Sequence, residues 1–257
     1  MRRIYGLEEA RDKVIGKDRE RIKIGTLSEK SLHAILKFYF EPNSENHEIK
    51  LGSFFADAVG ENGIVEIQTR GAYRLKQKLM YFLAVSDVTL VLPIIRKRKL
   101  IWIDPETGET SEGGRVTKRG RLCDAFSELY GILDLLDNKR LHICVMFLDV
   151  TDYKLLDGYG EEKKLRATKF DRIPDEIIEE IYMNCPEDYL ELLPKEMGDL
   201  SEEFTAKELA KKLKLKSPNA YSMIHVLEKM GLCEEAGLLG RAKTYKLNFE
   251  REIFDEQ

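Results

Sequence analysis

The sequence predicts an α/β protein: a mixed β-sheet flanked by helices, followed by a smaller C-terminal domain. Between residues 26 and 150, helix-like and strand-like segments alternate in the order α-β-β-β-α-β-β-α-β, which favours a mixed sheet with helices beside it. The run Leu141–Val150 is nearly all apolar, as expected of a central strand buried on both faces. After residue 195 the pattern changes to two helices and a β-hairpin.

Composition excludes several classes of protein. The chain has 257 residues, with 46 Asp and Glu against 42 Lys and Arg, so its net charge of −4 argues against a histone-like binder but not against a local basic face. The longest apolar stretch, Val88–Ile95, is far too short to span a membrane, and the N-terminus lacks a signal-peptide core. We therefore expect a cytoplasmic protein with no membrane partner.

The cysteines and histidines show no metal-binding or disulfide spacing. The four cysteines are far apart and form no C-x-x-C pair, so buried reduced thiols are favoured over disulfides or a zinc site. The four histidines are scattered and form no H-E-x-x-H motif.

Changes in composition divide the chain into four predicted segments. Residues 1–25 form a charged arm, partly helical, that either is a solvated leader or contacts phosphates. Residues 26–150 form the first domain, whose first helix begins at a Thr26–Glu29 capping box. A charged helical connector covers 151–195, and a separate domain covers 196–257.

Within the first domain, turn residues separate the predicted elements. A helix follows Gly71, and the basic run Arg96–Lys99 is expected to be a hairpin tip. A further helix is expected over 124–136. The predicted strands are Glu48–Leu51, Ser53–Val59, Ile64–Thr69, Val88–Ile95, Leu100–Ile103 and Leu141–Val150.

Two carboxylates, Asp57 and Glu66, are the residues that most directly indicate a chemical function. A four-residue loop over 60–63 places Asp57 opposite Glu66, through the pairs Val59–Ile64 and Ala58–Val65. Two carboxylates facing each other across a strand pair repel unless a cation lies between them. An oxygen-rich site of this kind suits Mg²⁺ or Mn²⁺. Two other interpretations remain open: exposed charges on a hydrated face, or neutralisation by Lys50 on the neighbouring strand.

The residues around this pair resemble the core of PD-(D/E)XK nucleases. The resemblance runs from Gly52 to Leu83: a strand ending in Asp57, a hairpin, Glu66-Ile-Gln68 and a following helix. It implies a restriction-endonuclease-like fold and metal-dependent cleavage of phosphodiester bonds. The roles that the resemblance implies are Asp57 and Glu66 as ligands of Mg²⁺ (or Mn²⁺) with the Ile67 carbonyl, Gln68 positioning water, Lys76 stabilising the transition state and Glu29 as the first-helix glutamate.

Two departures from the family pattern keep a second function open. Ala56 stands where the family has proline, and Gln68 replaces the usual lysine. Glu29 is also explained by its place in a capping box. The alternative function is a non-catalytic DNA-binding regulator that has a degenerate nuclease fold.

The C-terminal domain resembles a winged helix-turn-helix. A Thr205–Glu208 capping box opens one helix, a second helix covers 220–230, and strands are expected over 232–235 and 242–248. Nine basic and four acidic residues between Thr205 and Leu247 leave a local charge of +5. The resemblance implies binding of nucleic acid, with duplex DNA as the expected partner and a homodimer as one option. Its candidate contacts are Lys211, Lys212, Asn219, Tyr221, Ser222, His225, Arg241 and Lys243. A protein-interaction scaffold without nucleic acid is the third interpretation.

Overall fold

The computed structural model describes residues 6–18, 31–113, 120–158 and 167–249. The chain forms two compact units, each built from separate stretches of sequence. Unit 1 comprises residues 1–67, 93–120 and 146–180, and unit 2 comprises residues 68–92, 121–145 and 181–257. The units cut across the predicted boundaries at residues 150 and 195, because three long strands each contribute residues to both units.

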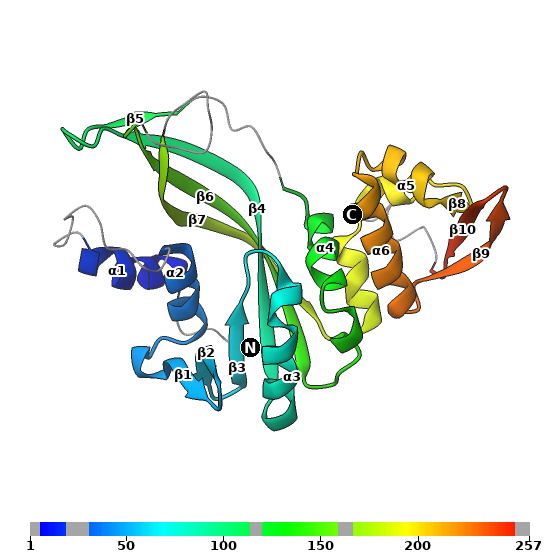
Figure 1. The fold of residues 1–257 in the computed structure, drawn as a ribbon, viewed down its shortest axis with the longest axis horizontal. Helices are drawn as coiled ribbons and strands as arrows, with labels where there is room; N and C mark the ends of the chain where they lie inside the picture. Colours follow the sequence, from blue (N-terminus) through cyan, green and yellow to red (C-terminus); the bar gives the residue numbers. More distant parts are fainter. Residues whose placement is uncertain (1–5, 19–30, 114–119, 159–166, 250–257) are drawn as a thin grey trace. The chain divides into compact units, whose positions relative to one another are not determined.

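In the described part of the chain, seven strands form one sheet with the order β1-β2-β3-β4-β6-β7, and β5 pairs with β4. This arrangement confirms the prediction of a mixed α/β fold with a sheet flanked by helices (Figure 1). The strands are β1 (His47–Leu51), β2 (Phe54–Gly60), β3 (Gly63–Ile67), β4 (Val88–Ile103), β5 (Thr110–Glu112), β6 (Leu141–Leu155) and β7 (Thr168–Met183).

Unit 1 contains helices α1 (Leu7–Asp18) and α2 (Ser31–Phe40). The two helices pack together, and α2 also contacts β2 and β3. α2 buries Leu32, Ile35 and Leu36, whose helical spacing predicted this element. Helix α1 fits the partly helical arm that was expected, whereas the Thr26–Glu29 capping box lies outside the described residues.

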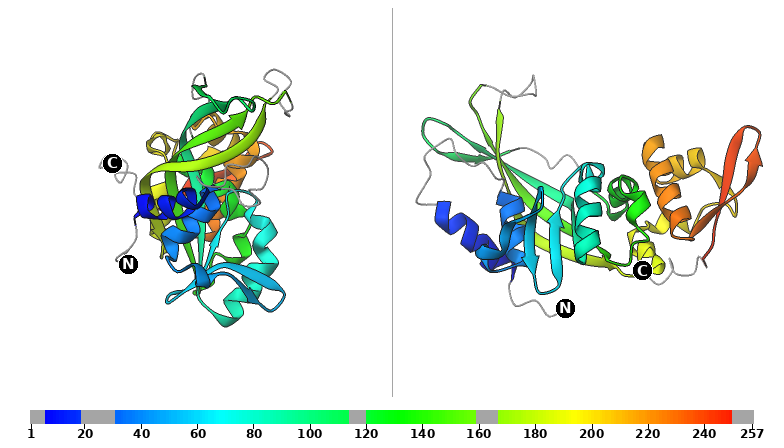
Figure 2. Two further views of the ribbon diagram at one scale, coloured as in Figure 1. Left: turned by 90° about the vertical axis from the view of Figure 1, so that its left-hand side faces the viewer. Right: turned by 60° about the horizontal axis from the view of Figure 1, so that its bottom comes forward.

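Unit 2 contains helices from the middle of the sequence and the C-terminal elements. Gly71, at φ +74°, precedes a 3₁₀ turn that leads into the predicted helix. β8 and β9 flank β10 in a small sheet next to α5 and α6 (Figures 1 and 2). The elements are α3 (Lys76–Val85), α4 (Ala125–Tyr130), β8 (Phe204–Thr205), α5 (Ala206–Lys212), α6 (Ser217–Lys229), β9 (Cys233–Leu239) and β10 (Ala242–Leu247).

The hairpin tip predicted at Arg96–Lys99 is wrong, because β4 continues through these residues without a break. Their cations find carboxylates on neighbouring strands: Arg96 pairs with Asp149, Arg98 with Asp152 and Lys99 with Glu112. Three of the four cations of the run are therefore paired within the sheet, so the run does not require a strand end exposed to solvent.

The helical connector predicted over 151–195 is also wrong. β6 continues to Leu155, and Thr168–Met183 is the edge strand β7. An edge strand tolerates Pro174, which has no N–H to donate, and it exposes charged residues such as Glu176 and Glu179. Short 3₁₀ turns over Pro186–Leu192 and Lys195–Met197 follow the strand.

The thiol prediction is confirmed for three of the four cysteines. Cys123, Cys144 and Cys233 are buried and free, whereas Cys185 is free but exposed. Burial raises the pKa of Cys123 to about 11 and that of Cys233 to about 12. None of the helices in the described ranges has the length and apolar composition needed to cross a bilayer.

Candidate functional site

The β2–β3 hairpin has the register that the sequence predicted. Ala58 pairs with Val65, and Val59 pairs with Ile64. One step further, side chains join the two strands: the Asp57 N–H donates to Glu66 Oε1 at 3.1 Å, and the Ile67 N–H donates to Asp57 Oδ2 at 2.8 Å. Both acids are buried, with Asp57 9% and Glu66 1% exposed. Hydrogen bonds from two backbone N–H groups, those of Asp57 and Ile67, therefore hold the two carboxylates at the predicted position.

A third acid occupies the same level of the sheet on β1. The pairs His47–Ala58 and Ile49–Ala56 set Glu48 opposite Asp57 across β1 and β2. We call Glu48, Asp57 and Glu66 the carboxylate row. Glu48 has a φ of +52°, a conformation that L-residues rarely adopt and that is often found at functional sites.

Helix α2 supplies the basic groups that face this row. His33 Nε2 lies 3.1 Å from Asp57 Oδ2, and Lys37 Nζ lies 2.6 Å from Glu48 Oε1. His33 and Lys37 are four residues apart, so they lie on one side of α2. Lys37 is only 3% exposed, and a buried ammonium group is costly unless it is paired. Helix α2 therefore places a basic side chain beside two of the three carboxylates of the row.

Sequence reasoning missed His33 and Lys37. The available signal was the presence of two basic side chains at helical spacing within the otherwise apolar run Leu32–Phe40. Lys50, the predicted neutralising residue, is set opposite Phe55 by the β1–β2 register and is exposed.

The other predicted catalytic residues that the structure describes have partners of their own. Gln68 donates a side-chain hydrogen bond to the Arg70 carbonyl, and Lys76 forms an ion pair with Asp134. Glu29 lies outside the described residues. Only Asp57 and Glu66 of the predicted catalytic set are thus brought together by contacts among the described residues.

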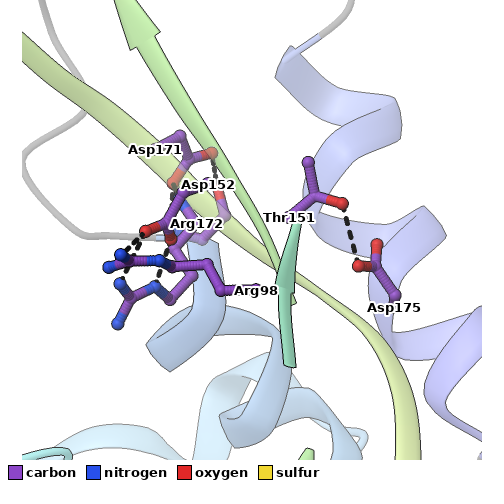
Figure 3. A network of polar contacts seen from close by, with 7 residues as sticks. Arg98, Thr151, Asp152, Asp171, Arg172 and Asp175 are labelled. Carbon is purple, nitrogen blue, oxygen red and sulfur yellow. Dashed lines mark hydrogen bonds and ion pairs between the residues drawn. The ribbon is translucent and has the colours of Figure 1, made fainter. Parts of the chain in front are cut away.

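A buried polar network holds α2 against β7 in unit 1 (Figure 3). The Asp171 carboxylate accepts hydrogen bonds from the backbone N–H and the hydroxyl of Ser31, the first residue of α2, and so caps the first turn of this helix. The neighbouring Arg172 forms a bidentate pair with Asp152, and Arg98 Nη1 approaches the same carboxylate at 3.4 Å. This network fixes the N-terminal end of α2, the helix that carries His33.

Two other carboxylates on β6 and β7, Asp149 and Asp175, have pKa values shifted in opposite directions. The hydrogen bonds from Arg96 hold the pKa of Asp149 below its usual range. Burial raises the pKa of Asp175, which accepts a hydrogen bond from the Thr151 hydroxyl at 2.8 Å (Figure 3).

Across the described ranges, no cluster of three or more His, Cys, Asp or Glu side chains is arranged to hold a metal ion. A cation at the row would depend on two carboxylates, a backbone carbonyl and water. Mg²⁺ is commonly bound in this way, because it keeps several of its waters and uses one or two protein carboxylates. The donor set therefore fits Mg²⁺ or Mn²⁺ better than a metal that requires a full protein cage.

The predicted nucleic-acid contacts of unit 2 fall into two groups. Lys211 and Arg241 are exposed and form no ion pair with a described residue, and Asn219, Tyr221 and Ser222 lie in the first half of α6. Lys212 pairs with Asp199, and Lys243 pairs with Glu235.

His225 belongs to a contact between helices. α6 packs against α4, where the His225 ring stacks on Tyr130 with centroids 5.6 Å apart. One turn further along α6, Lys229 pairs with Asp137 at 2.7 Å.

Comparison with known proteins defines the family. Residues 30–184 match a domain of unknown function, DUF8091, and the chain belongs to this family. An uncharacterized protein of Treponema pallidum (strain Nichols) is 30% identical over 150 residues, which cover 58% of this chain and 59% of that relative. The chain thus spans about three fifths of the length of the relative. No solved structure matches the chain significantly.

The matched range includes the whole carboxylate row, His33 and Lys37. It ends one residue after β7, so the elements that follow Pro186 lie outside it.

Proposed function

We propose that this protein is a metal-dependent nuclease whose reaction centre is the carboxylate row and whose C-terminal elements bind DNA. The observation that carries the proposal is the buried Asp57–Glu66 pair: Glu66 accepts a hydrogen bond from the Asp57 N–H, and Asp57 accepts one from the Ile67 N–H, at the level where β2 and β3 separate. Two acids held this close together in a buried site are costly unless a cation or a chemical role compensates for them.

In this proposal, Asp57, Glu66 and the Ile67 carbonyl would hold Mg²⁺ or Mn²⁺. The bound ion supplies Lewis-acid polarisation of a phosphodiester and a more acidic water. Ile67 N–H orients Asp57 through Oδ2, and His33 approaches the same oxygen, so the chain itself fixes the direction of this carboxylate. Lys37 pairs with Glu48 and so offsets the charge of one of the three carboxylates.

The test compares the wild type with Asp57→Asn and Glu66→Gln, using Glu61→Gln in the exposed β2–β3 turn as the matched control. Wild type and control should cleave DNA with Mn²⁺ or Mg²⁺, and their Tm should rise with added metal by mass action. Both site variants should lose cleavage and the metal-dependent rise in Tm. A wild type that neither cleaves DNA nor responds to metal would contradict the proposal.

The C-terminal elements support the DNA-binding part of the proposal. A short helix, a second helix and a hairpin follow in the order of a winged helix, with β8 completing the small sheet. The capping box is present, since the Thr205 hydroxyl accepts from the Glu208 N–H and Glu208 accepts from the Thr205 N–H. Lys211 and Arg241 are the predicted basic contacts without an ion pair to a described residue, so they are the best placed for phosphates.

Duplex binding is tested by the salt dependence of affinity in the full chain. Lys211→Ala with Arg241→Ala should weaken binding to all sequences similarly and reduce the salt slope by about two, one for each phosphate contact. The control is Lys246→Ala, because Lys246 pairs with Glu234 on the same hairpin and is not among the candidate contacts. An unchanged salt slope in the double variant would overturn the assignment of these two contacts.

Gln68 favours a second candidate function, a DNA-binding regulator without catalysis. Gln68 occupies the position of the usual lysine of PD-(D/E)XK nucleases, and its side-chain amide donates a hydrogen bond to the Arg70 carbonyl of the same loop. This candidate predicts duplex binding by the full chain without a metal-dependent rise in Tm. The same two measurements therefore separate the two functions.

A further inference from the structure

The helices of unit 2 form a ladder of three stacked rings, which we call the aromatic ladder: Tyr130 of α4, and His225 and Tyr221 of α6. His225 stacks between the two tyrosines, with centroid distances of 5.6 Å to Tyr130 and 6.4 Å to Tyr221. The interplanar angles are 24° and 26°, so the His225 ring is stacked on each tyrosine with a moderate tilt. His225 is oriented further by Glu228, whose carboxylate lies 3.0 Å from Nδ1.

The ladder is open to solvent although it is apolar. Tyr130 is 45% exposed and Tyr221 is 49% exposed. Neither phenol hydroxyl is hydrogen-bonded to a residue in the described ranges, so an internal hydrogen bond does not account for tyrosine at positions 130 and 221. An exposed aromatic face in register with two other rings is the surface on which a nucleobase stacks.

Unpaired cations lie close to the Tyr221 end of the ladder along the chain. Lys214 and Lys216 precede α6, and Tyr221 lies in its second turn. With Lys211, they form no ion pair within the part of the chain that the structure describes. This combination of stacking surface and free positive charge matches the two components of single-stranded nucleic acid, bases and phosphates.

The opposite end of α6 is occupied. Tyr130 stacks on His225 and Asp137 neutralises Lys229, so partners from residues 130–137 contact the C-terminal half of the row Ser217, Tyr221, His225 and Lys229. The part of this face of α6 without such a partner is short. It suits the stacking of one or two unpaired bases better than the insertion of α6 along the major groove of a duplex.

We propose that the aromatic ladder binds unpaired bases of single-stranded nucleic acid, with phosphates contacted by Lys211, Lys214 and Lys216. The inference rests on the proposed binding of nucleic acid by the C-terminal elements and names the strand form that these elements prefer. It adds Tyr130, which lies outside those elements in the sequence, to the binding surface.

The test measures fluorescence anisotropy of a labelled oligothymidylate and of a matched duplex with the full chain in EDTA, which silences metal-dependent cleavage. The single strand should bind more tightly. Tyr221→Ala and Tyr130→Ala should each weaken single-strand binding by about tenfold, within the range measured for the loss of one base–aromatic stack. Tyr221→Phe keeps the ring and should restore binding, and Tyr81→Ala on α3, an exposed tyrosine outside the ladder, is the control.

A second measurement uses only the wild-type protein, so it does not depend on whether a variant folds. An oligonucleotide carrying 5-iododeoxyuridine should crosslink on irradiation to peptides containing Tyr130 or Tyr221. Single-strand binding that is unaffected by both alanine variants, with crosslinks elsewhere, would overturn the inference. If duplex binding still depends on Lys211 and Arg241 in that case, the proposed DNA-binding role of the C-terminal elements stays valid. If the protein binds neither the single strand nor the duplex, both that role and the single-strand inference are wrong.

Discussion

Charged side chains around α2 in unit 1 are buried and pair across long stretches of sequence, whereas those on the β9–β10 hairpin are exposed and pair with the adjacent strand. Ser31 bonds to Asp171, 140 residues away, and Asp152 pairs with Arg172 at a side-chain exposure of 3%. On the hairpin, Lys243 pairs with Glu235 and Lys246 with Glu234, all at least two fifths exposed.

The difference in burial between these two sets of pairs indicates which charges stabilise the fold. A buried pair that loses one partner leaves an uncompensated charge in a poorly solvated site, whereas an exposed pair that loses one partner regains water. The buried polar contacts of Asp171, Asp152 and Lys37 therefore hold α2 and the elements around it, and the ion pairs of the hairpin adjust the surface charge.

The largest effect is expected from Asp152→Ala. Arg172 would stay buried without its bidentate partner, which costs about 3–5 kcal/mol in the free energy of unfolding. Urea denaturation measures the loss. Glu234→Ala, which breaks the exposed pair with Lys246, is the control and should leave the unfolding midpoint unchanged. Equal losses in the two variants would remove the distinction between the regions.

Lys37→Met should have the next largest effect. It removes the buried cation from the carboxylate row, and loss of a hydrogen bond to a charged group costs about 1.5–3 kcal/mol. Lys50→Met on the neighbouring strand β1 is the matched control, because Lys50 is exposed and forms no ion pair with a described residue. Under the proposed function, added Mn²⁺ should raise the Tm of Lys37→Met more than that of the wild type. The opposite order would show that Lys37 supports metal binding.

Asp171→Ala should destabilise the protein by about 0.5–2 kcal/mol, the usual cost of losing a helix cap. The loss should be local, so hydrogen exchange should accelerate over the first turn of α2, near His33, and stay unchanged in α6. Asp171→Asn retains an acceptor oxygen for Ser31 and should lose less. Uniform acceleration across the chain would argue that Asp171 supports the whole fold.

The smallest effect at neutral pH comes from the buried thiols, whose contribution to stability is lost only at alkaline pH. The buried thiols of Cys123 and Cys233 have pKa values raised to about 11 and about 12, whereas an unfolded thiol has a pKa of about 8.5. The unfolded state therefore loses these protons first, and stability should fall as pH rises above that value toward the folded pKa values. Urea midpoints between neutral and alkaline pH measure the slope, and Cys123→Ala with Cys233→Ala should flatten it. A slope that stays the same in the double variant would assign the effect to other groups.

Short-range patterns in the sequence determined the elements that depend on neighbouring residues. The loop length and the two-residue period of a strand predicted the pairing of β2 with β3, and with it the position of Asp57 and Glu66. Helical spacing predicted α2 and α6, and the Thr205–Glu208 capping box formed as expected. These features could be predicted because their hydrogen bonds join residues a few positions apart.

Only the tertiary structure decided how the charges are partnered. Arg96 and Arg98 continue a strand because Asp149 and Asp152 face them, and Thr168–Met183 is a strand because the edge of a sheet accepts it. His33 reached Asp57, and Tyr130 reached His225, through contacts that no local pattern encodes. A buried charge or an exposed ring looks the same in the sequence whatever lies opposite it, because its energy is set by partners that folding brings from distant parts of the chain.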